Sequence, residues 1–234
     1  MGLLVPSTSP PTVMGLADRA LDAAATGTRE VARLALRSWM DLTVSGAEHV
    51  PAHGGVILAA THTSHADSLA LGAAVRRRLG FLGAADLATT PVLGPLLPRL
   101  GLLPVERGSG DASLLGDLAD LVAAGEALVV YPEGSRSRDG SVHRPRSGVA
   151  RLATATGAPV IPVGVTGTAT AWPVDAGPRP WPRAAVSVRF GAPLAPPDGT
   201  PLERRRWNDE LHDRLVELSG RPRTDELAPV GGAA

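Results

Sequence analysis

Short apolar runs alternate with helix-forming stretches along most of this chain, and this alternation limits the fold more than any other feature. Three of the runs lack charged side chains, namely residues 54–61 (GGVILAAT), 127–130 (ALVV) and 158–167 (APVIPVGVTG). Strands that are buried on both faces give such uninterrupted runs, because helices cover both sides of the sheet. We therefore expect an α/β fold, a single domain with a mostly parallel or mixed sheet flanked by helices.

The segments around this alternation divide the chain further. Residues 1–12 are rich in proline and serine and are expected to form a flexible leader. Residues 13–41 predict an N-terminal pair of helices, residues 42–219 the domain, and residues 220–234 a disordered tail. Further helices are expected over residues 66–79, 111–125, 147–157 and 201–220, and further strands over residues 80–85, 101–107 and 184–193.

Composition excludes several kinds of chemistry. All 23 basic residues are arginine, so no lysine can form a Schiff base or a phosphate-binding P-loop. Cysteine is absent, which excludes disulfides, thiolate nucleophiles and cysteine-ligated zinc. The 23 acidic residues balance the arginines, so nucleic acid is not an expected partner. No stretch of 18 residues is apolar without a charge or a proline, so no membrane-spanning helix is expected.

Polar side chains are concentrated in Thr61–Ser68 (THTSHADS), directly after the first apolar run. Ligands of open α/β sheets bind at the carboxyl ends of strands, where this stretch is predicted to lie. His62 and Asp67 fit a general base and the carboxylate that orients it, with Nδ1–H bonded to Asp67 and Nε2 left to take a proton. Alternatively His62, His65 and Asp67 are metal ligands, Ser64 is a nucleophile, or the stretch is a polar helix start without chemistry.

Three further clusters also lie at predicted strand ends or within strands. Tyr131–Ser137 (YPEGSRS) follows the second apolar run as a tight turn, and Arg107 ends the segment GLLPVER. Pro162 lies inside the third apolar run, where proline marks an edge strand or a bulge. No G-x-S-x-G motif of a serine hydrolase occurs anywhere in the chain.

Four blocks in this order resemble the glycerolipid acyltransferase family, whose members include the 1-acylglycerol-3-phosphate acyltransferases. The blocks are HTSHAD (residues 62–67), GLLPVER (101–107), YPEGSRS (131–137) and VIPV (160–163). They are similar to the family pattern H-x4-D, G-x3-[IV]-x-R, [FY]-P-E-G-[ST]-R-S and an apolar block with proline. Three positions depart from the pattern. Thr61 replaces the usual asparagine before His62, and the segment GAADL (residues 83–87) lacks a common lysine. Arg146 stands one place before the usual basic position, which Ser147 occupies.

The resemblance implies transfer of a fatty acyl group from acyl-CoA or acyl carrier protein to the hydroxyl of a lysophospholipid. His62 and Asp67 would be the catalytic pair, and backbone N–H groups near the turn would stabilise the oxyanion. The substrate-binding residues would be Arg107, Glu133, Gly134, Ser135 and Arg136. No metal or bound cofactor is implied. A lipid-binding relative without activity, and a hydrolase that gives the acyl group to water, remain as alternatives.

A lipid substrate implies contact with a membrane surface, and we expect a cytoplasmic protein on the inner face of the cell membrane. The predicted helix from about Arg29 to Met40 is the best candidate for this contact. Val31, Leu34 and Trp39 offer an apolar face, and Arg29, Arg33 and Arg37 a basic one. If this helix serves the membrane alone, the chain without residues 1–41 should still fold.

Overall fold

The computed structural model describes residues 30–31, 33–84, 102–105, 111–173 and 184–229. Within these residues the chain forms one seven-stranded sheet in the order β1-β7-β6-β2-β5-β3-β4. Neighbouring strands are parallel except β6 and β7, which are antiparallel. This mixed sheet confirms the expected α/β fold. The strands are β1 (Thr43–Ser45), β2 (Val56–Ala60), β3 (Gly80–Ala84), β4 (Leu102–Val105), β5 (Ala127–Val130), β6 (Val160–Thr166) and β7 (Ser187–Phe190).

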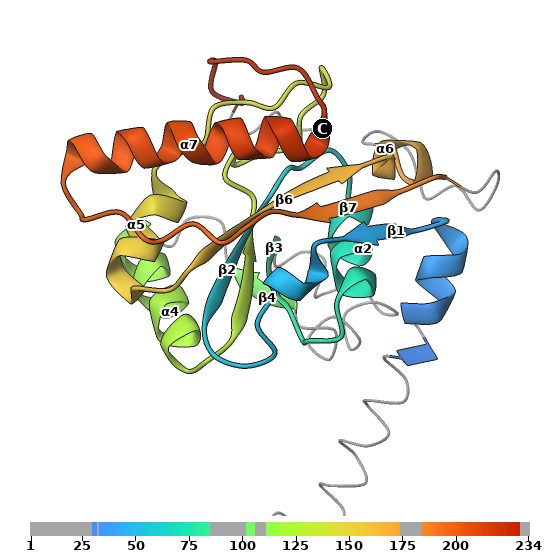
Figure 1. The fold of residues 1–234 in the computed structure, drawn as a ribbon, viewed down its shortest axis with the longest axis horizontal. Coiled ribbons are helices and arrows are strands. Elements are labelled where there is room, and N and C mark those ends of the chain that lie inside the picture. The colour runs from blue at the N-terminus through green and yellow to red at the C-terminus, as the bar shows by residue number, and fades with distance from the viewer. Residues whose placement is uncertain (1–29, 32, 85–101, 106–110, 174–183, 230–234) are drawn as a thin grey trace, which may run out of the picture.

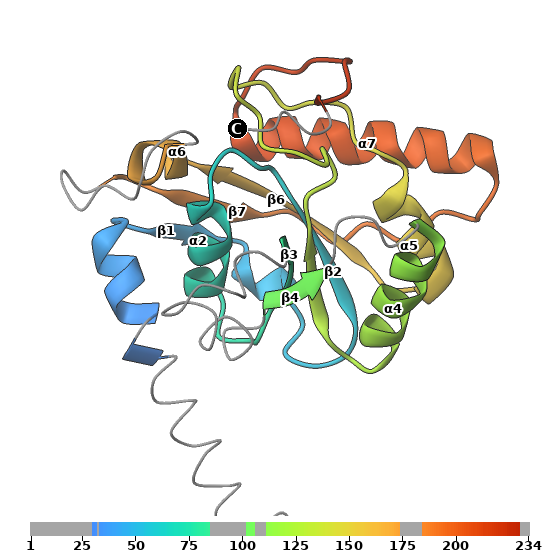
Figure 2. The same cartoon turned by 180° about the vertical axis from the view of Figure 1, so that it is seen from behind.

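Helices cover both faces of the sheet (Figures 1 and 2). One face carries α4 (Asp111–Ala123), α5 (Gly148–Thr156) and α7 (Pro201–Ser219), and the other carries α2 (Ala66–Ala74). The N-terminal helix, residues 30–39 with residue 32 outside the described part, packs on the same face as α2. The first predicted helix of the N-terminal pair lies outside the described residues. The short elements are η1 (Ala47–His49) and α6 (Thr168–Ala171).

The central strand β2 shows why its sequence is an uninterrupted apolar run. Val56, Leu58 and Ala60 point into the core beneath α2, while Ile57 and Ala59 point into the core beneath α4, α5 and α7. All five side chains are fully buried. Since each face of the strand lies under helices, no residue in it can be polar without losing solvation.

Pro162 lies opposite a bulge, which interrupts the pairing of β6 with the segment after β7. Val160 pairs with Leu194 and Val163 pairs with Phe190, so two residues of β6 lie opposite three residues, 191–193. The carbonyl of Pro162 still accepts the N–H of Gly191. A bulge leaves a gap in the ladder, which lets a residue without an N–H sit in an interior strand.

The helix expected over residues 66–79 is shorter than predicted and ends at Ala74, because Val75 is extended with φ −116° and ψ 155°. An arginine run follows this helix end, and one of its members, Arg77, bonds to loops elsewhere in the chain. The guanidinium of Arg77 donates to the carbonyl oxygens of Pro51, Gly54 and Gly125. These bonds hold the chain in an extended course that helical periodicity alone does not reveal.

The C-terminal tail is ordered as far as Pro229, so the prediction of disorder from residue 220 is wrong over the described residues. Thr224 donates its N–H to Val142, and Val142 donates its own N–H to Pro222. The Arg221 guanidinium donates to the carbonyls of Gly140 and Ser141 at 2.7 and 2.5 Å. These partners lie about 80 residues earlier in the chain. The tail lacks periodicity and is ordered by tertiary contacts alone.

His212 is fully buried in α7, and its Nε2 lies 2.9 Å from the carbonyl of Val142. Burial lowers the pKa of His212, and the charge of Arg223 adds to this. The hydrogen bond to Val142 and the charges of Asp213 and Asp225 oppose the shift. The unfolded chain therefore binds the proton first as pH falls below about 6.5. Stability should be full above that pH and should decline as pH falls through the lowered pKa.

We expect that His212→Gln, whose amide can still donate to the same carbonyl, loses part of this acid sensitivity. Urea unfolding at pH 7.5 and pH 5 measures it. The free energy of unfolding should fall less between these pH values in the variant than in the wild type. The free energies of unfolding of the two proteins should diverge by at most ~1.4 kcal/mol per pH unit, because one histidine binds at most one proton. Equal pH dependence in the two proteins would contradict the assignment.

Candidate active site

The site lies where two neighbouring parallel strands end. Strands β2 and β5 pair in register from Val56 with Ala127 to Ala59 with Val130, so their carboxyl ends meet at one edge. The loop after β2 carries residues 61–65, and the loop after β5 begins at Tyr131. Two blocks that are 70 residues apart in the sequence thereby come together, as expected for the ligand-binding edge of an α/β sheet.

The His62 imidazole is held by Asp67. Its Nδ1 lies 2.9 Å from Asp67 Oδ2, and the aspartate side chain is fully buried whereas the histidine keeps 17% of its side-chain surface exposed. A carboxylate can only accept, so Nδ1 carries the hydrogen and Nε2 carries a free lone pair. In the described part of the chain no side chain or backbone group bonds Nε2. His62 can therefore take a proton from a ligand at that nitrogen.

Three other groups donate to Asp67 and fix its orientation. The backbone N–H groups of Thr63 and Ser64 lie 2.6 and 2.9 Å from Oδ2, and the hydroxyl of Thr168 donates to Oδ1. These donors satisfy the hydrogen-bonding capacity of the buried carboxylate and prevent it from rotating away from the histidine. The same bonds occupy the backbone N–H groups of Thr63 and Ser64, so these two groups are not free to serve as oxyanion donors.

Tyr131 forms the other side of the His62 site. Its ring stacks on the imidazole with the ring centroids 3.8 Å apart and the planes 12° apart. Its hydroxyl lies 2.7 Å from the hydroxyl of Ser68 in α2. Burial, followed by the nearby charge of Asp67, raises the pKa of Tyr131, so the phenol stays protonated. The stacked ring restricts the imidazole to one plane and leaves its edge open.

Glu133 supports the loop that carries His62. One carboxylate oxygen accepts the backbone N–H of His62 at 3.0 Å, and the other accepts that of His143 at 3.1 Å. The side chain is fully buried, and this burial raises its pKa. Both carboxylate oxygens therefore accept backbone N–H groups, so Glu133 holds the loop of His62 in place. Ser137 completes the support by donating its N–H to the His62 carbonyl.

The remaining residues of the YPEGSRS block lie around Glu133. Gly134 has φ 81°, and a Cβ there would lie 2.7 Å from Arg146 Nε, so the turn requires glycine. Ser135 donates its hydroxyl to the carbonyl of Pro229 in the tail at 2.9 Å. Arg136 lies near His65, and after burial its charge is the next cause of a lowered His65 pKa. Arg136 Nη1 is buried and has no partner among the described residues.

The structure also bears on the other predicted roles. Arg107 lies outside the described residues, so the structure does not place it. Ser64 is fully buried, and its hydroxyl donates to the Trp172 carbonyl and accepts the Ala66 N–H, which does not suit a nucleophile. Among the described residues no group of three His, Asp or Glu side chains could hold a metal ion.

Two contributors to the site were missed by the sequence analysis. Thr168 comes from α6, directly after β6, and only the order of strands in the sheet brings it to Asp67. Tyr131 was part of a recognised block, yet stacking on His62 depends on the register of β5 against β2. Thr61 replaces the usual asparagine and bonds both the N–H and the carbonyl of Val165 in β6. Its hydroxyl thus ties the end of β2 to β6 directly before His62.

The comparisons with known proteins agree with this geometry. The sequence profile of the Acyltransferase family matches residues 41–166, more than half of the chain. The chain therefore belongs to the Acyltransferase family. A 1-acyl-sn-glycerol-3-phosphate acyltransferase of Bacillus subtilis is 23% identical over 180 residues, which cover 74% of this chain and 86% of that protein.

Two further proteins resemble this chain, and they differ in how much of their own length the match covers. A chloroplastic 1-acyl-sn-glycerol-3-phosphate acyltransferase of Brassica napus is 26% identical over 133 residues, 56% of this chain but only 38% of that protein. This chain thus spans less than half the length of the plant relative. The crystal structure of a 1-acyl-sn-glycerophosphate acyltransferase of Thermotoga maritima aligns with a TM-score of 0.67 and 22% identity, over 89% of this chain and 86% of that chain. This alignment confirms the fold.

Proposed function

We propose that this protein transfers a fatty acyl group from acyl-CoA or acyl carrier protein to the free hydroxyl of a lysophospholipid. The observation that carries the proposal is the His62–Asp67 pair, with Nε2 unoccupied, at the carboxyl end of β2 in a member of the Acyltransferase family. The acceptor that we propose is 1-acylglycerol-3-phosphate, with phosphatidic acid as the product. The names of the relatives from Bacillus subtilis and Brassica napus support this choice.

The proposed reaction needs one base that later acts as an acid. His62 Nε2 removes the proton of the acceptor hydroxyl while its oxygen attacks the carbonyl carbon of the thioester. The tetrahedral intermediate collapses, the C–S bond breaks, and the imidazolium returns the proton to the leaving thiolate. Asp67 stabilises the imidazolium between these steps, since its Oδ2 lies 2.9 Å from Nδ1. No covalent acyl-enzyme, metal or bound cofactor is part of this proposal.

A substrate panel tests the proposed function. The purified full chain is incubated with isotope-labelled acyl-CoA or acyl carrier protein and with lysolipids that differ only in headgroup, and the products are measured by mass spectrometry. We expect labelled diacyl lipid, formed fastest from 1-acylglycerol-3-phosphate. Equal rates for acceptors with and without phosphate would contradict the proposed acceptor, and no diacyl lipid with any acceptor would contradict acyl transfer.

Arg136 is proposed to bind the acceptor phosphate, together with Arg107. Arg136 lies near His65, and its Nη1, which has no partner among the described residues, suits a phosphate oxygen. We expect Arg136→Ala to raise KM for a phosphate-bearing acceptor roughly ten- to hundredfold, since a charge-assisted bond is worth ~1.5–3 kcal/mol. Arg151→Ala, an exposed arginine on α5, is the control. An unchanged acceptor KM with a raised donor KM would move Arg136 to the donor side.

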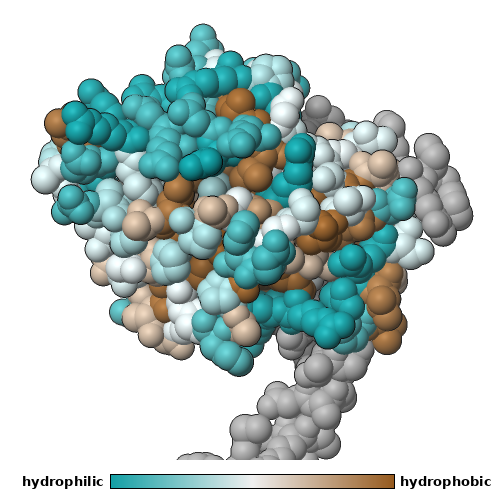
Figure 3. Space-filling view, in the orientation of Figure 1, coloured by the Kyte–Doolittle hydropathy of each residue, from teal (hydrophilic) through white to brown (hydrophobic). Residues whose placement is uncertain are grey.

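We also propose that the protein acts at the inner face of the cell membrane through its N-terminal helix. Val31 and Leu34 are 69% and 58% exposed, and hydrophobic surface lies beside this helix at the right of Figure 3. The basic face expected from sequence is partly occupied, because Arg33 pairs with Glu30 and Arg37 donates to the Ala73 carbonyl. The apolar pair therefore carries the proposal. None of the helices in the described residues is long and apolar enough to cross a bilayer.

The structure changes how this contact should be tested. Met40 is fully buried, and Leu36 and Trp39 pack against the same core, so removal of residues 1–41 would open it. We expect instead that Val31→Ser combined with Leu34→Ser lowers binding to anionic vesicles at least tenfold in sedimentation, because each side chain contributes ~1.5–3 kcal/mol on insertion. Leu202→Ser removes an equally exposed leucine from α7 and is the control. Equal losses in the double variant and the control would contradict the proposal.

A further inference from the structure

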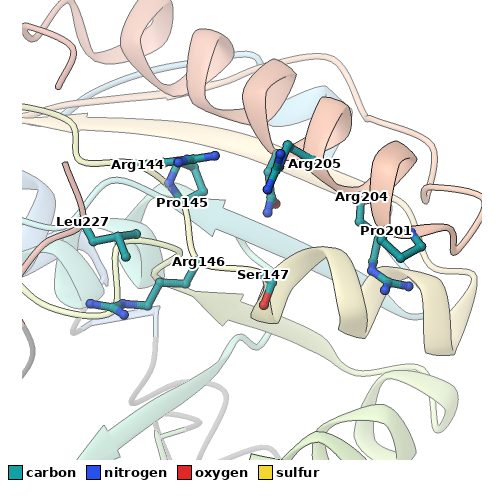
Figure 4. A pocket seen from close by; sticks show the side chains of 9 residues that line it. Arg144, Pro145, Arg146, Ser147, Pro201, Arg204, Arg205 and Leu227 are labelled. Carbon is teal, nitrogen blue, oxygen red and sulfur yellow. The ribbon is translucent and has the colours of Figure 1, made fainter. Parts of the chain in front are cut away.

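A pocket lined by arginine lies between α7 and the loop that precedes α5. Its volume is about 460 Å³, and its walls include Arg144 and Arg146 from the loop, Arg204, Arg205 and Asn208 from α7, and Leu227 from the tail. Figure 4 shows Arg144 and Arg205 extending into the same space from opposite sides. The volume falls within the range of pockets that bind small ligands, ~300–1,000 Å³.

Among the described residues, the lining of this pocket carries positive charge and no carboxylate. Four arginines and no acidic residue line it. Arg204 and Arg146 are held by carbonyl groups, those of Gly199 for Arg204 and of Glu133 and Ala228 for Arg146. Arg144 and Arg205 have no hydrogen bond or ion pair from their side chains to any described residue. Guanidinium groups held together without carboxylates favour an anion, and their planar forks match the oxygens of phosphate.

A second feature points to a ligand that is more than a phosphate ion. Asn208 Oδ1 is buried and has no hydrogen-bond partner among the described residues. A buried acceptor without a donor is costly, so a hydroxyl or amino group of a ligand would stabilise it. Phosphates and such donor groups occur together in a nucleotide.

The pocket shares a residue with the support of the catalytic histidine. Arg146 lines the pocket, and its Nε lies 3.2 Å from the Glu133 carbonyl oxygen. The Glu133 carboxylate in turn accepts the backbone N–H of His62. The pocket and the loop of His62 are therefore connected through Glu133.

We propose that this pocket binds the phosphorylated adenosine end of acyl-CoA. Coenzyme A carries phosphates, a ribose hydroxyl and an amino group at one end, and a flexible arm joins them to the thioester at the other. The inference rests on the proposed function, because it assigns part of the donor in that reaction. The catalytic site alone does not distinguish acyl-CoA from acyl carrier protein, whereas the proposed pocket favours acyl-CoA.

A binding measurement tests the pocket without catalysis. Adenosine 3′,5′-bisphosphate is titrated into the full chain by calorimetry, with Arg144→Ala combined with Arg205→Ala as the pocket variant. Arg206→Ala is the matched control, because Arg206 lies on the same helix but pairs with Glu203 and does not line the pocket. We expect binding by the wild type and the control, and at least tenfold weaker binding by the pocket variant. No binding by the wild type, or equal binding by all three proteins, would overturn the proposal.

Kinetics with two donors separate this proposal from the proposed function. The pocket variant should raise KM for acyl-CoA at least tenfold, and the increase should vanish with an acyl N-acetylcysteamine thioester, which has no phosphate. An increase in KM for the acceptor, an equal loss with both donors, or a loss confined to acyl carrier protein would overturn the proposal. Absence of transfer by the wild type from any donor would overturn the proposed function instead, while calorimetry would still decide on the pocket.

Discussion

His62→Ala is expected to lower kcat by at least two orders of magnitude, with a smaller effect on the KM of either substrate. The imidazole is the only described group of this site with a free lone pair and an orienting carboxylate. General base catalysis of this kind contributes roughly 10²–10⁴-fold in rate. The measurement is steady-state transfer from labelled acyl-CoA, with circular dichroism to show that the variant is folded.

Asp67→Asn should lose as much activity as His62→Ala, and the double variant should be no worse than either. The two side chains act as a unit, so their effects do not add. His65→Ala is the matched control, because His65 is the neighbouring histidine but does not bond Asp67. An active His62→Ala protein beside an inactive His65→Ala protein would show that the base was assigned to the wrong histidine.

Glu133→Gln is expected to reduce both stability and kcat, because this buried side chain holds the loop of His62. The two backbone N–H groups of His62 and His143 now meet carboxylate oxygens, and an amide would turn its NH₂ group toward one of them. Charge-assisted bonds are worth ~1.5–3 kcal/mol each, so the free energy of unfolding should fall by roughly 2–4 kcal/mol. The loop that holds His62 would shift, which lowers kcat.

Urea unfolding and steady-state kinetics on the same protein measure both effects of Glu133→Gln. Glu203→Gln is the control, because it removes an exposed carboxylate whose partner is Arg206, and such surface pairs contribute ~0–1 kcal/mol. A Glu133→Gln protein of normal stability with a raised acceptor KM would restore the contact with the acceptor that the sequence suggested. A loss of kcat together with stability supports the positioning role.

The elements of the fold could be predicted where their residues repeat a local pattern. The uninterrupted run over β2 predicted a strand buried on both faces, and the structure confirms it. The bulge opposite Pro162 followed from the missing N–H of proline. The end of α2 at Ala74 and the order of the tail to Pro229 could not be predicted. Both depend on side chains, Arg77 and Arg221, that bond carbonyls far away in the sequence.

In the site, too, local contacts could be predicted from the sequence and distant ones could not. His62 and Asp67 lie within five residues of each other, so a turn into a helix was enough to predict their contact. The roles of Glu133, Tyr131 and Thr168 depend on which strands are neighbours in the sheet, and strand order cannot be read from local sequence. The resemblance of the YPEGSRS block predicted Glu133 as a site residue. Its burial, which favours a positioning role, is known only from the structure.

The central claim is that His62 directs the acyl group to a lipid hydroxyl, and a measurement of stoichiometry tests it most directly. Released thiol, diacyl lipid and free fatty acid are measured together in one reaction of the full chain with labelled acyl-CoA and 1-acylglycerol-3-phosphate. We expect one diacyl lipid for each thiol released, little free fatty acid, and a loss of all three in His62→Ala. Free fatty acid in place of the lipid would indicate a hydrolase, binding of both substrates without thiol release would indicate an inactive lipid-binding protein, and either result would contradict the claim.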